Sequence, residues 1–300
     1  MATCLHPILA VSLYKNEDNK NVLQFLPSGD IWNIEQKKQV YGSEEVFLLP
    51  CGRCSACREE YAKEWAKRCS IEAKIHKYNY FITLTYDEYH ISKASKLDFS
   101  QKFLKALGFE LTGSPDRPRF FACMERGELT GRLHFHAILF LDKELELIEP
   151  VKKGDFYHYH SPIISKLWTF GLHDIAPFEH DCAAYVGKYA TKSGKCFMSR
   201  NLAKPYYLVN REQIINDDFK IYVDYNKRNF IDVPKCFVRW FCEDDIAGIL
   251  DYKLKRSQLQ RLLILADIHT NKMKSESLLV SANILAYLKH TQNKAERSEL

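Results

Sequence analysis

The stretch that decides the fold, residues 131–140, reads GRLHFHAILF. Its second half is apolar without helical spacing, and its first residue is a glycine typical of a turn, so the pattern predicts a buried strand. Side chains alternate along a strand, which places His134 and His136 on one face and Phe135 on the other. Two neutral imidazoles and one nearby oxygen donor can hold a divalent ion and leave positions open for a substrate.

The same two histidines also fit a purely structural interpretation. Half-buried imidazoles that bond to backbone or carboxylate groups would give the same spacing, and 11 histidines in 300 residues make such a triplet common by chance. The surrounding sequence has to decide between the two.

A strand predicted at 119–125 precedes this stretch, and a turn joins the two. The expected antiparallel hairpin brings Glu125 close to His134 and His136. Asp98 with Gln101 predicts a capping box that opens a helix. The full order is β-α-β-β-α-β, with the remaining elements expected at 80–86, 98–107, 163–170 and, as an edge strand, 171–177. This order predicts an α+β fold, a ferredoxin-like antiparallel sheet with helices on one face and the other face free to carry chemistry.

Composition sets limits on compartment and partners. The chain is 46% hydrophobic with a net charge of +5, which suits one substantial domain with a smaller appendage and permits a polyanionic partner. No stretch of 18 apolar residues and no secretory signal stand in the sequence, so we expect no membrane partner and a reducing cytoplasm. In that setting the clustered members of the ten cysteines are expected to be free or to bind metal.

Residues 51–57 read CGRCSAC. Cys51, Cys54 and Cys57 on a glycine-containing turn can face one centre, which suits thiolate ligation of zinc. Cys69, or a distant cysteine or histidine, would supply the fourth ligand. Free thiols at a tight turn remain the alternative.

A helix is predicted at 181–192, and on it Tyr185, Lys188, Tyr189 and Lys192 share one face. With 17 tyrosines in the chain, a Tyr-x-x-x-Tyr pair also arises by chance, but a buried core stripe would not include two lysines. The glycines and lysines nearby do not have the spacing of a phosphate-binding loop, so we expect no ATP hydrolysis.

Four segments are expected along the chain. An N-terminal strand and turn segment occupies 1–50, and a catalytic core with the cysteine element at its start occupies 51–195. A β-rich extension is predicted at 196–245 and a helical tail at 246–300. Within the core, a helix from Ser55 to about Tyr78 carries an apolar stripe at Tyr61, Trp65, Cys69 and Ala73.

Several motifs in order resemble one family. They are PCGRCSACR (50–58), EWAKRC (64–69), YFITLTYDE (80–88), FFACMERGELTGRLHFHAILF (120–140), LWTFG (167–171) and AAYVGKYATK (183–192). The chain resembles the rolling-circle initiators of the HUH endonuclease superfamily, and more closely the replication initiation proteins of the gokushovirus branch of the Microviridae. One departure is MERG at 124–127, where that family tends to have Gly-Glu-Tyr-Gly, although the glutamate is kept.

The resemblance implies roles for residues. His134 and His136 would bind Mg²⁺ or Mn²⁺ with Glu125 as third ligand, and Tyr185 and Tyr189 would be the nucleophiles that nick single-stranded origin DNA, assisted by Lys188. Lys192 and Arg132 are expected to contact the DNA.

The same resemblance implies partners and a location. Host helicase and DNA polymerase would complete replication in the cytoplasm of a bacterial cell. A zinc-dependent single-strand binding protein without catalysis, and a metal-dependent hydrolase that uses water, remain the alternatives.

Overall fold

The computed structural model describes residues 4, 8–15, 17, 21–25, 46–127, 131–153, 156–178, 196–222, 229–244 and 248–249. It consists of two units, Met1–Glu60 with Ile246–Leu300, and Tyr61–Asp245. The helical tail predicted at 246–300 lies outside the described residues except for 248–249.

The first unit contains a three-stranded antiparallel sheet in the order β2-β1-β3. Its strands are β1 (Ile8–Lys15), β2 (Asn21–Phe25) and β3 (Val46–Leu49). The strands expected before residue 50 are therefore present. Pro50 follows β3 and leads into the cysteine-rich turn.

The two-histidine stretch forms β6 (Leu133–Leu141), which lies between β5 (Arg119–Arg126) and β4 (Tyr78–Tyr86) in the second unit. The whole sheet has the order β10-β5-β6-β4-β9-β8-β7. The four other strands are β7 (Ile148–Lys153), β8 (Phe156–His160), β9 (Gly171–Pro177) and β10 (Cys196–Met198). Every pairing that involves β4, β5 or β6 is antiparallel. The α+β class with a large antiparallel sheet is confirmed.

The position predicted for β9 is wrong. The sequence predicts β9 at the edge of the sheet, but β8 pairs with it on the far side, and β7 pairs with β8. Both of these strands come from the insertion at 142–162, whose polar residues do not show a strand pattern.

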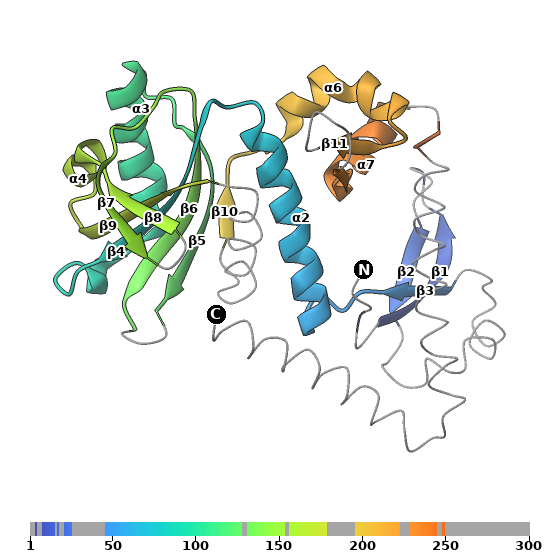
Figure 1. Ribbon diagram of the computed structural model, residues 1–300. Coiled ribbons are helices and arrows are strands. Elements are labelled where there is room, and N and C mark those ends of the chain that lie inside the picture. The colour runs from blue at the N-terminus through green and yellow to red at the C-terminus, as the bar shows by residue number, and fades with distance from the viewer. Residues whose placement is uncertain are drawn as a thin grey trace. The chain divides into compact units, whose positions relative to one another are not determined.

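One sheet face packs against η3 (Asp98–Phe103), α3 (Leu104–Thr112) and α4 (Pro162–Leu167). Phe135 of β6 points to this face, where its ring lies near those of Phe99 and Trp168. Figure 1 shows α3 and α4 on this side of the sheet.

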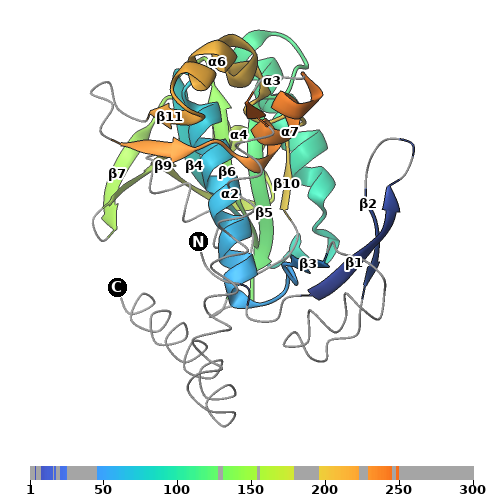
Figure 2. The ribbon, with the colours of Figure 1, turned by 90° about the vertical axis from the view of Figure 1, so that its right-hand side faces the viewer.

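The other face is covered by α2 (Ser55–Ala73), whose Trp65 and Cys69 pack against Phe121 and Phe140. In Figure 2, α2 crosses in front of the strands. The prediction of helices on one face is thus wrong, because the apolar stripe of α2 needs a sheet face of its own. Burial from both sides explains why residues 137–141 are apolar without alternation.

The capping box predicted at Asp98 is also wrong. Leu97 stands at the N-cap of η3, and the Asp98 carboxylate accepts hydrogen bonds from Tyr86 Oη at 2.9 Å and from the Ser95 N–H at 3.0 Å. Asp98 therefore ties the helix to β4 and to the preceding turn.

The extension at 196–245 is predicted to be β-rich, and this is wrong. Its longest elements are α6 (Lys204–Asn216) and α7 (Lys235–Glu243), beside the short strands β11 (Lys220–Tyr222) and β12 (Phe230–Asp232). Tyr207 of α6 packs against three aromatic rings of α7, which are Phe237, Trp240 and Phe241. This packing of residues distant in sequence overrides the weak local strand signal.

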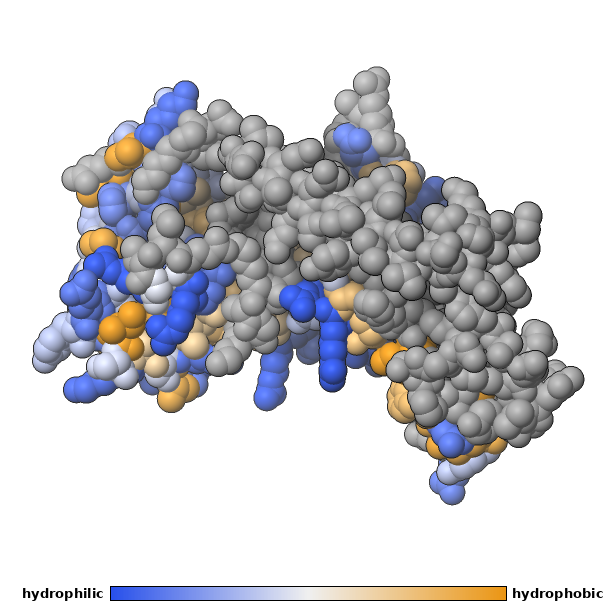
Figure 3. Space-filling view, turned by 90° about the horizontal axis from the view of Figure 1, so that it is seen from below, coloured by the Kyte–Doolittle hydropathy of each residue, from blue (hydrophilic) through white to orange (hydrophobic). Residues whose placement is uncertain are grey.

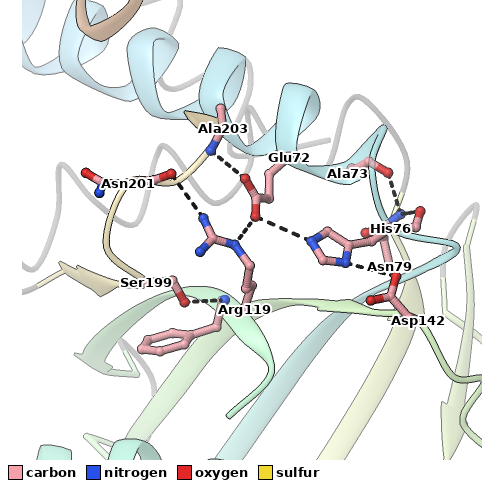
Figure 4. A network of polar contacts seen from close by, with 10 residues as sticks. Glu72, Ala73, His76, Asn79, Arg119, Asp142, Ser199, Asn201 and Ala203 are labelled. Carbon is pink, nitrogen blue, oxygen red and sulfur yellow. Dashed lines mark hydrogen bonds and ion pairs between the residues drawn. The ribbon is translucent and has the colours of Figure 1, made fainter. Parts of the chain in front are cut away.

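A buried carboxylate connects α2, β5 and the residues after β10. Glu72 accepts hydrogen bonds from Arg119 Nε and the Ala203 N–H, and its Oε1 lies 3.4 Å from His76 Nε2 (Figure 4). Arg119 also donates to Asn201 O at 3.1 Å. The network holds residues 199–203 against the sheet, next to the strand that carries Glu125.

The described surface seen in Figure 3 carries apolar side chains in small groups among hydrophilic ones. Among the described helices, none combines the length and the apolar character that a membrane span requires.

Candidate metal centre

The β5–β6 hairpin places three potential ligands together. Its register sets Glu125 opposite His134 and Cys123 opposite His136, so that all four side chains point to the face that α2 partly covers. The ligand atoms of Glu125, His134 and His136 lie within 4.8 Å of one another. The proximity predicted from the hairpin is therefore observed.

The side chains converge on one carboxylate oxygen. Glu125 Oε1 lies 3.2 Å from His134 Nε2 and 3.1 Å from His136 Nε2. Donors at adjacent positions around an ion bound at about 2.1 Å are separated by about 3 Å, so the set fits a small divalent ion. Two imidazoles and one carboxylate form a donor set suited to Mn²⁺ or Mg²⁺ with further positions open.

The hydrogen bonds on the far side of each ring favour this use. His134 Nδ1 lies 3.1 Å from the carbonyl oxygen of Arg132, which can only accept, so Nδ1 carries the proton. His136 Nδ1 lies 3.1 Å from Thr83 Oγ1 on β4. With both Nδ1 atoms protonated, both Nε2 atoms present a lone pair to the ion.

The electrostatics agree with a ligand role for Glu125. Burial opposes ionisation of its carboxyl, but the hydrogen bonds and charges of His136 and His134 outweigh burial and lower its pKa. The side chain is 12% exposed. Glu125 is therefore an anion that faces two imidazoles, as a metal ligand should be.

Thr83 is a site residue that the sequence analysis does not single out. It lies opposite His136 in the β4–β6 register and opposite Asp174 of β9 on its other side. Asp174 contacts His158 Nδ1 at 2.5 Å, which extends the polar row across the sheet. The signal for Thr83 is its alternation with Phe81 and Thr85, which puts all three on the histidine face.

The predicted tyrosine helix falls in a part of the chain for which no position is given. Tyr185, Lys188, Tyr189 and Lys192 all lie outside the described residues. The residues that flank this segment do have positions. The Phe178 N–H donates to Asn79 O at 2.9 Å, and Cys196 pairs with Cys123 in the β10–β5 register.

Two other features have described surroundings. Arg132, predicted to contact DNA, donates to Glu88 Oε1 at 3.0 Å and is 43% exposed, so its charge is partly paired. Cys123 and Cys196 are joined by a disulfide, which nothing in the sequence predicts because 73 residues separate them.

The cysteine cluster differs from the predicted set. Cys51, Cys54 and Cys57 lie together, but their fourth neighbour is Cys4, while Cys69 is buried against Trp65 and Phe121. Burial opposes ionisation of Cys51, but the N–H groups of Arg53 and Cys54 outweigh it and lower its pKa to about 6.

The LWTFG motif has a structural role. Trp168 is buried in the core and donates to Thr85 O at 3.3 Å, and Gly171 leaves no room for a Cβ against the backbone of Thr85. The motif thus packs α4 and β9 against β4, the strand that carries Thr83.

Comparison with known proteins follows these observations. The family model of the replication-associated protein ORF2 matches residues 79–194, the segment that begins in β4 and includes the metal cluster. The chain resembles phage replication-associated proteins, as its motifs predict. No solved structure matches the chain.

Three relatives are of the Microviridae type. The replication-associated protein ORF2 of Spiroplasma virus 4 is 29% identical over 307 residues, which cover 91% of this chain and 93% of the relative. The replication-associated protein ORF4 of Chlamydia phage 1 is 30% identical over 180 residues, 57% of this chain and 43% of its own. The replication-associated protein VP4 of Bdellovibrio phage phiMH2K is 31% identical over 183 residues, 56% and 55% respectively.

Proposed function

We propose that this chain initiates rolling-circle replication of a phage genome by nicking single-stranded origin DNA through a phosphotyrosine intermediate. The observation that carries the proposal is the Glu125–His134–His136 cluster, inside the segment that matches the replication-associated family. The strand order β5-β6-β4-β9, with helices after β4 and after β6, supports a ferredoxin-like palm as its scaffold.

A divalent ion at this cluster would supply positive charge to the non-bridging oxygens of a phosphodiester. Tyr185 or Tyr189 attacks the phosphorus, its oxygen forms the new P–O bond, and the bond to the 3′ oxygen breaks. The 3′ oxygen leaves as a hydroxyl that primes a polymerase, and the 5′ phosphate stays on the tyrosine. Lys188 favours the phenolate and neutralises charge that develops in the transition state. The ester retains the bond energy, so rejoining requires no ATP.

Chain length supports the two tyrosines as nucleophiles. Tyr189 stands seven residues before Cys196, which pairs with Cys123, and Cys123 is two residues before Glu125. Seven extended residues reach at most about 25 Å, enough to bring a phenol to the cluster.

The proposal includes partners. The chain has no phosphate-binding loop, so a host helicase would unwind the template and a host polymerase would extend the 3′ end, in the cytoplasm of the infected bacterium. Arg132 and Lys192 would contact the phosphates.

The test uses the full chain with Mn²⁺ or Mg²⁺ and single-stranded oligonucleotides that tile the genome encoding it. We expect a protein–DNA adduct on a denaturing gel, abolished by EDTA and by His134→Ala or His136→Ala, and kept by the control His90→Ala. DNA binding should survive these changes, because phosphate contacts are spread over many basic groups. Retention of DNA without cleavage would favour the single-strand binding alternative, and cleavage without an adduct would favour a hydrolase that uses water.

The tyrosines can be tested separately. Tyr185→Phe and Tyr189→Phe should each still form an adduct but should not sustain repeated rounds that yield closed circles. The double variant should form no adduct, and the exposed control Tyr89→Phe should behave as wild type. A single variant that yields circles over many rounds would leave one tyrosine as the sole nucleophile.

A further inference from the structure

Four thiols from two distant parts of the first unit meet at one point. The sulfur atoms of Cys4, Cys51, Cys54 and Cys57 all lie within 4.8 Å of one another. Cys4 Sγ is 3.9 Å from Cys54 Sγ, and Cys51 Sγ is 3.9 Å from Cys57 Sγ. Thiolates at the corners of a tetrahedron around Zn²⁺, with Zn–S bonds of about 2.3 Å, are separated by about 3.8 Å. The observed spacing is therefore that of a four-thiolate zinc site.

The small sheet of this unit explains why Cys4 arrives there. β1 and β3 are antiparallel, and Ile8 pairs with Leu49 at the end of the ladder. Cys4 stands four residues before Ile8, and Cys51 stands two residues after Leu49. Both cysteines therefore leave the ladder at the same end, and strand pairing between segments far apart in sequence brings the fourth ligand to the other three.

The backbone around the sulfurs is arranged for thiolates. The N–H groups of Arg53 and Cys54 donate to Cys51 Sγ at 3.4 and 3.3 Å, and the Cys57 N–H donates to Cys54 Sγ at 3.4 Å. The Cys51 N–H donates to Cys4 Sγ at 3.3 Å. Donors aimed at sulfur stabilise negative charge there, and such outer bonds orient metal ligands.

Other uses of the four cysteines fit less well. A disulfide requires sulfur atoms about 2.05 Å apart, whereas the Cys4–Cys54 and Cys51–Cys57 sulfur pairs are each separated by 3.9 Å. An iron–sulfur cluster needs space for its inorganic core between the cysteines, and sulfur atoms within 4.8 Å of one another leave space for one ion.

We propose that Cys4, Cys51, Cys54 and Cys57 bind one structural Zn²⁺ that fixes the start of the chain to the turn before α2. Four protein ligands close the coordination sphere, so the ion has no open position for chemistry. Its role is to hold together a small unit whose described sheet has three short strands, which cannot bury a large core alone.

The experiment counts zinc in the full chain purified with reductant in chelator-treated buffer. The starting protein carries His134→Ala and His136→Ala, so that zinc at the other cluster does not enter the count. We expect about one zinc per chain, kept by the control Cys242→Ser, and lost on Cys4→Ser or Cys51→Ser. No zinc in the starting protein would overturn the proposal.

A second measurement covers a variant that does not fold. Cys4→His keeps a zinc ligand at this position, so it should retain the metal. With Co²⁺ in place of zinc, the absorption of a tetrahedral four-sulfur site should shift in Cys4→His to that of three sulfurs and one nitrogen. An unchanged cobalt spectrum in Cys4→His would exclude Cys4 as a ligand. Since the readouts are metal content and absorption, their failure leaves the nicking proposal untouched.

Discussion

Replacing Thr83 with valine should weaken Mn²⁺ binding at the Glu125–His134–His136 cluster. Thr83 Oγ1 lies 3.1 Å from His136 Nδ1, and the stacked ring of Phe81 lies at 5.8 Å between centroids on one side of the imidazole. Valine keeps the shape of threonine but accepts no hydrogen bond, so the Nδ1 proton loses its partner and the ring loses one constraint on its orientation.

The expected loss follows from that single bond. An outer partner of a metal-ligating histidine contributes about 10–100-fold in metal affinity, or about 1.4–2.7 kcal/mol. Thr85→Val is the matched control, because Thr85 lies opposite His134 on the same strand face. His134 Nδ1 bonds instead to the Arg132 carbonyl, which a substitution at position 85 leaves in place.

The assay is calorimetric titration of Mn²⁺ into wild type, Thr83→Val and Thr85→Val, with His134→Ala/His136→Ala as the reference without a site. Circular dichroism checks that each variant is folded. The reasoning is refuted if Thr83→Val binds Mn²⁺ as tightly as wild type, or if Thr85→Val loses as much affinity as Thr83→Val.

Two predictions concern the scaffold. Glu72→Gln should lower the free energy of unfolding by about 3–5 kcal/mol, since Glu72 is 0% exposed and its loss leaves Arg119 unpaired, whereas Glu243→Gln removes an exposed ion pair and should cost below about 1 kcal/mol. Burial opposes ionisation of Glu72, but its bonds to His76 and Arg119 outweigh burial and lower its pKa, so its contribution is present above the ordinary value near pH 4.3 and is lost as pH falls through the folded value. Urea unfolding followed by tryptophan fluorescence measures both, and equal costs for the two glutamines would contradict the buried-pair argument. Phe135→Ala should cost about 3–5 kcal/mol by the same measurement because the ring is 0% exposed, while Phe109→Ala, at 62% exposure, should cost far less; similar losses would mean that Phe135 is not a core residue.

The sequence by itself determined which side chains share a face. Alternation over residues 131–140 places His134 and His136 together, and the short turn before them sets the hairpin register that brings in Glu125. The helix beginning at Ser55 and its apolar stripe were equally readable. Each of these features follows from contacts between residues close in sequence, whose geometry is set by the strand or helix period.

Only the tertiary structure decided which distant segments pair. It placed β8 beside β9, α2 on the second sheet face, Thr83 behind His136 and Cys4 beside Cys51. Local periodicity says which face of an element is apolar but not what covers it, because that choice depends on the free energy of packing elements far apart along the chain. Cys4 shows this most clearly, since a single cysteine near the start of the chain has no spacing motif, and the β1–β3 ladder alone brings it to the other three thiols.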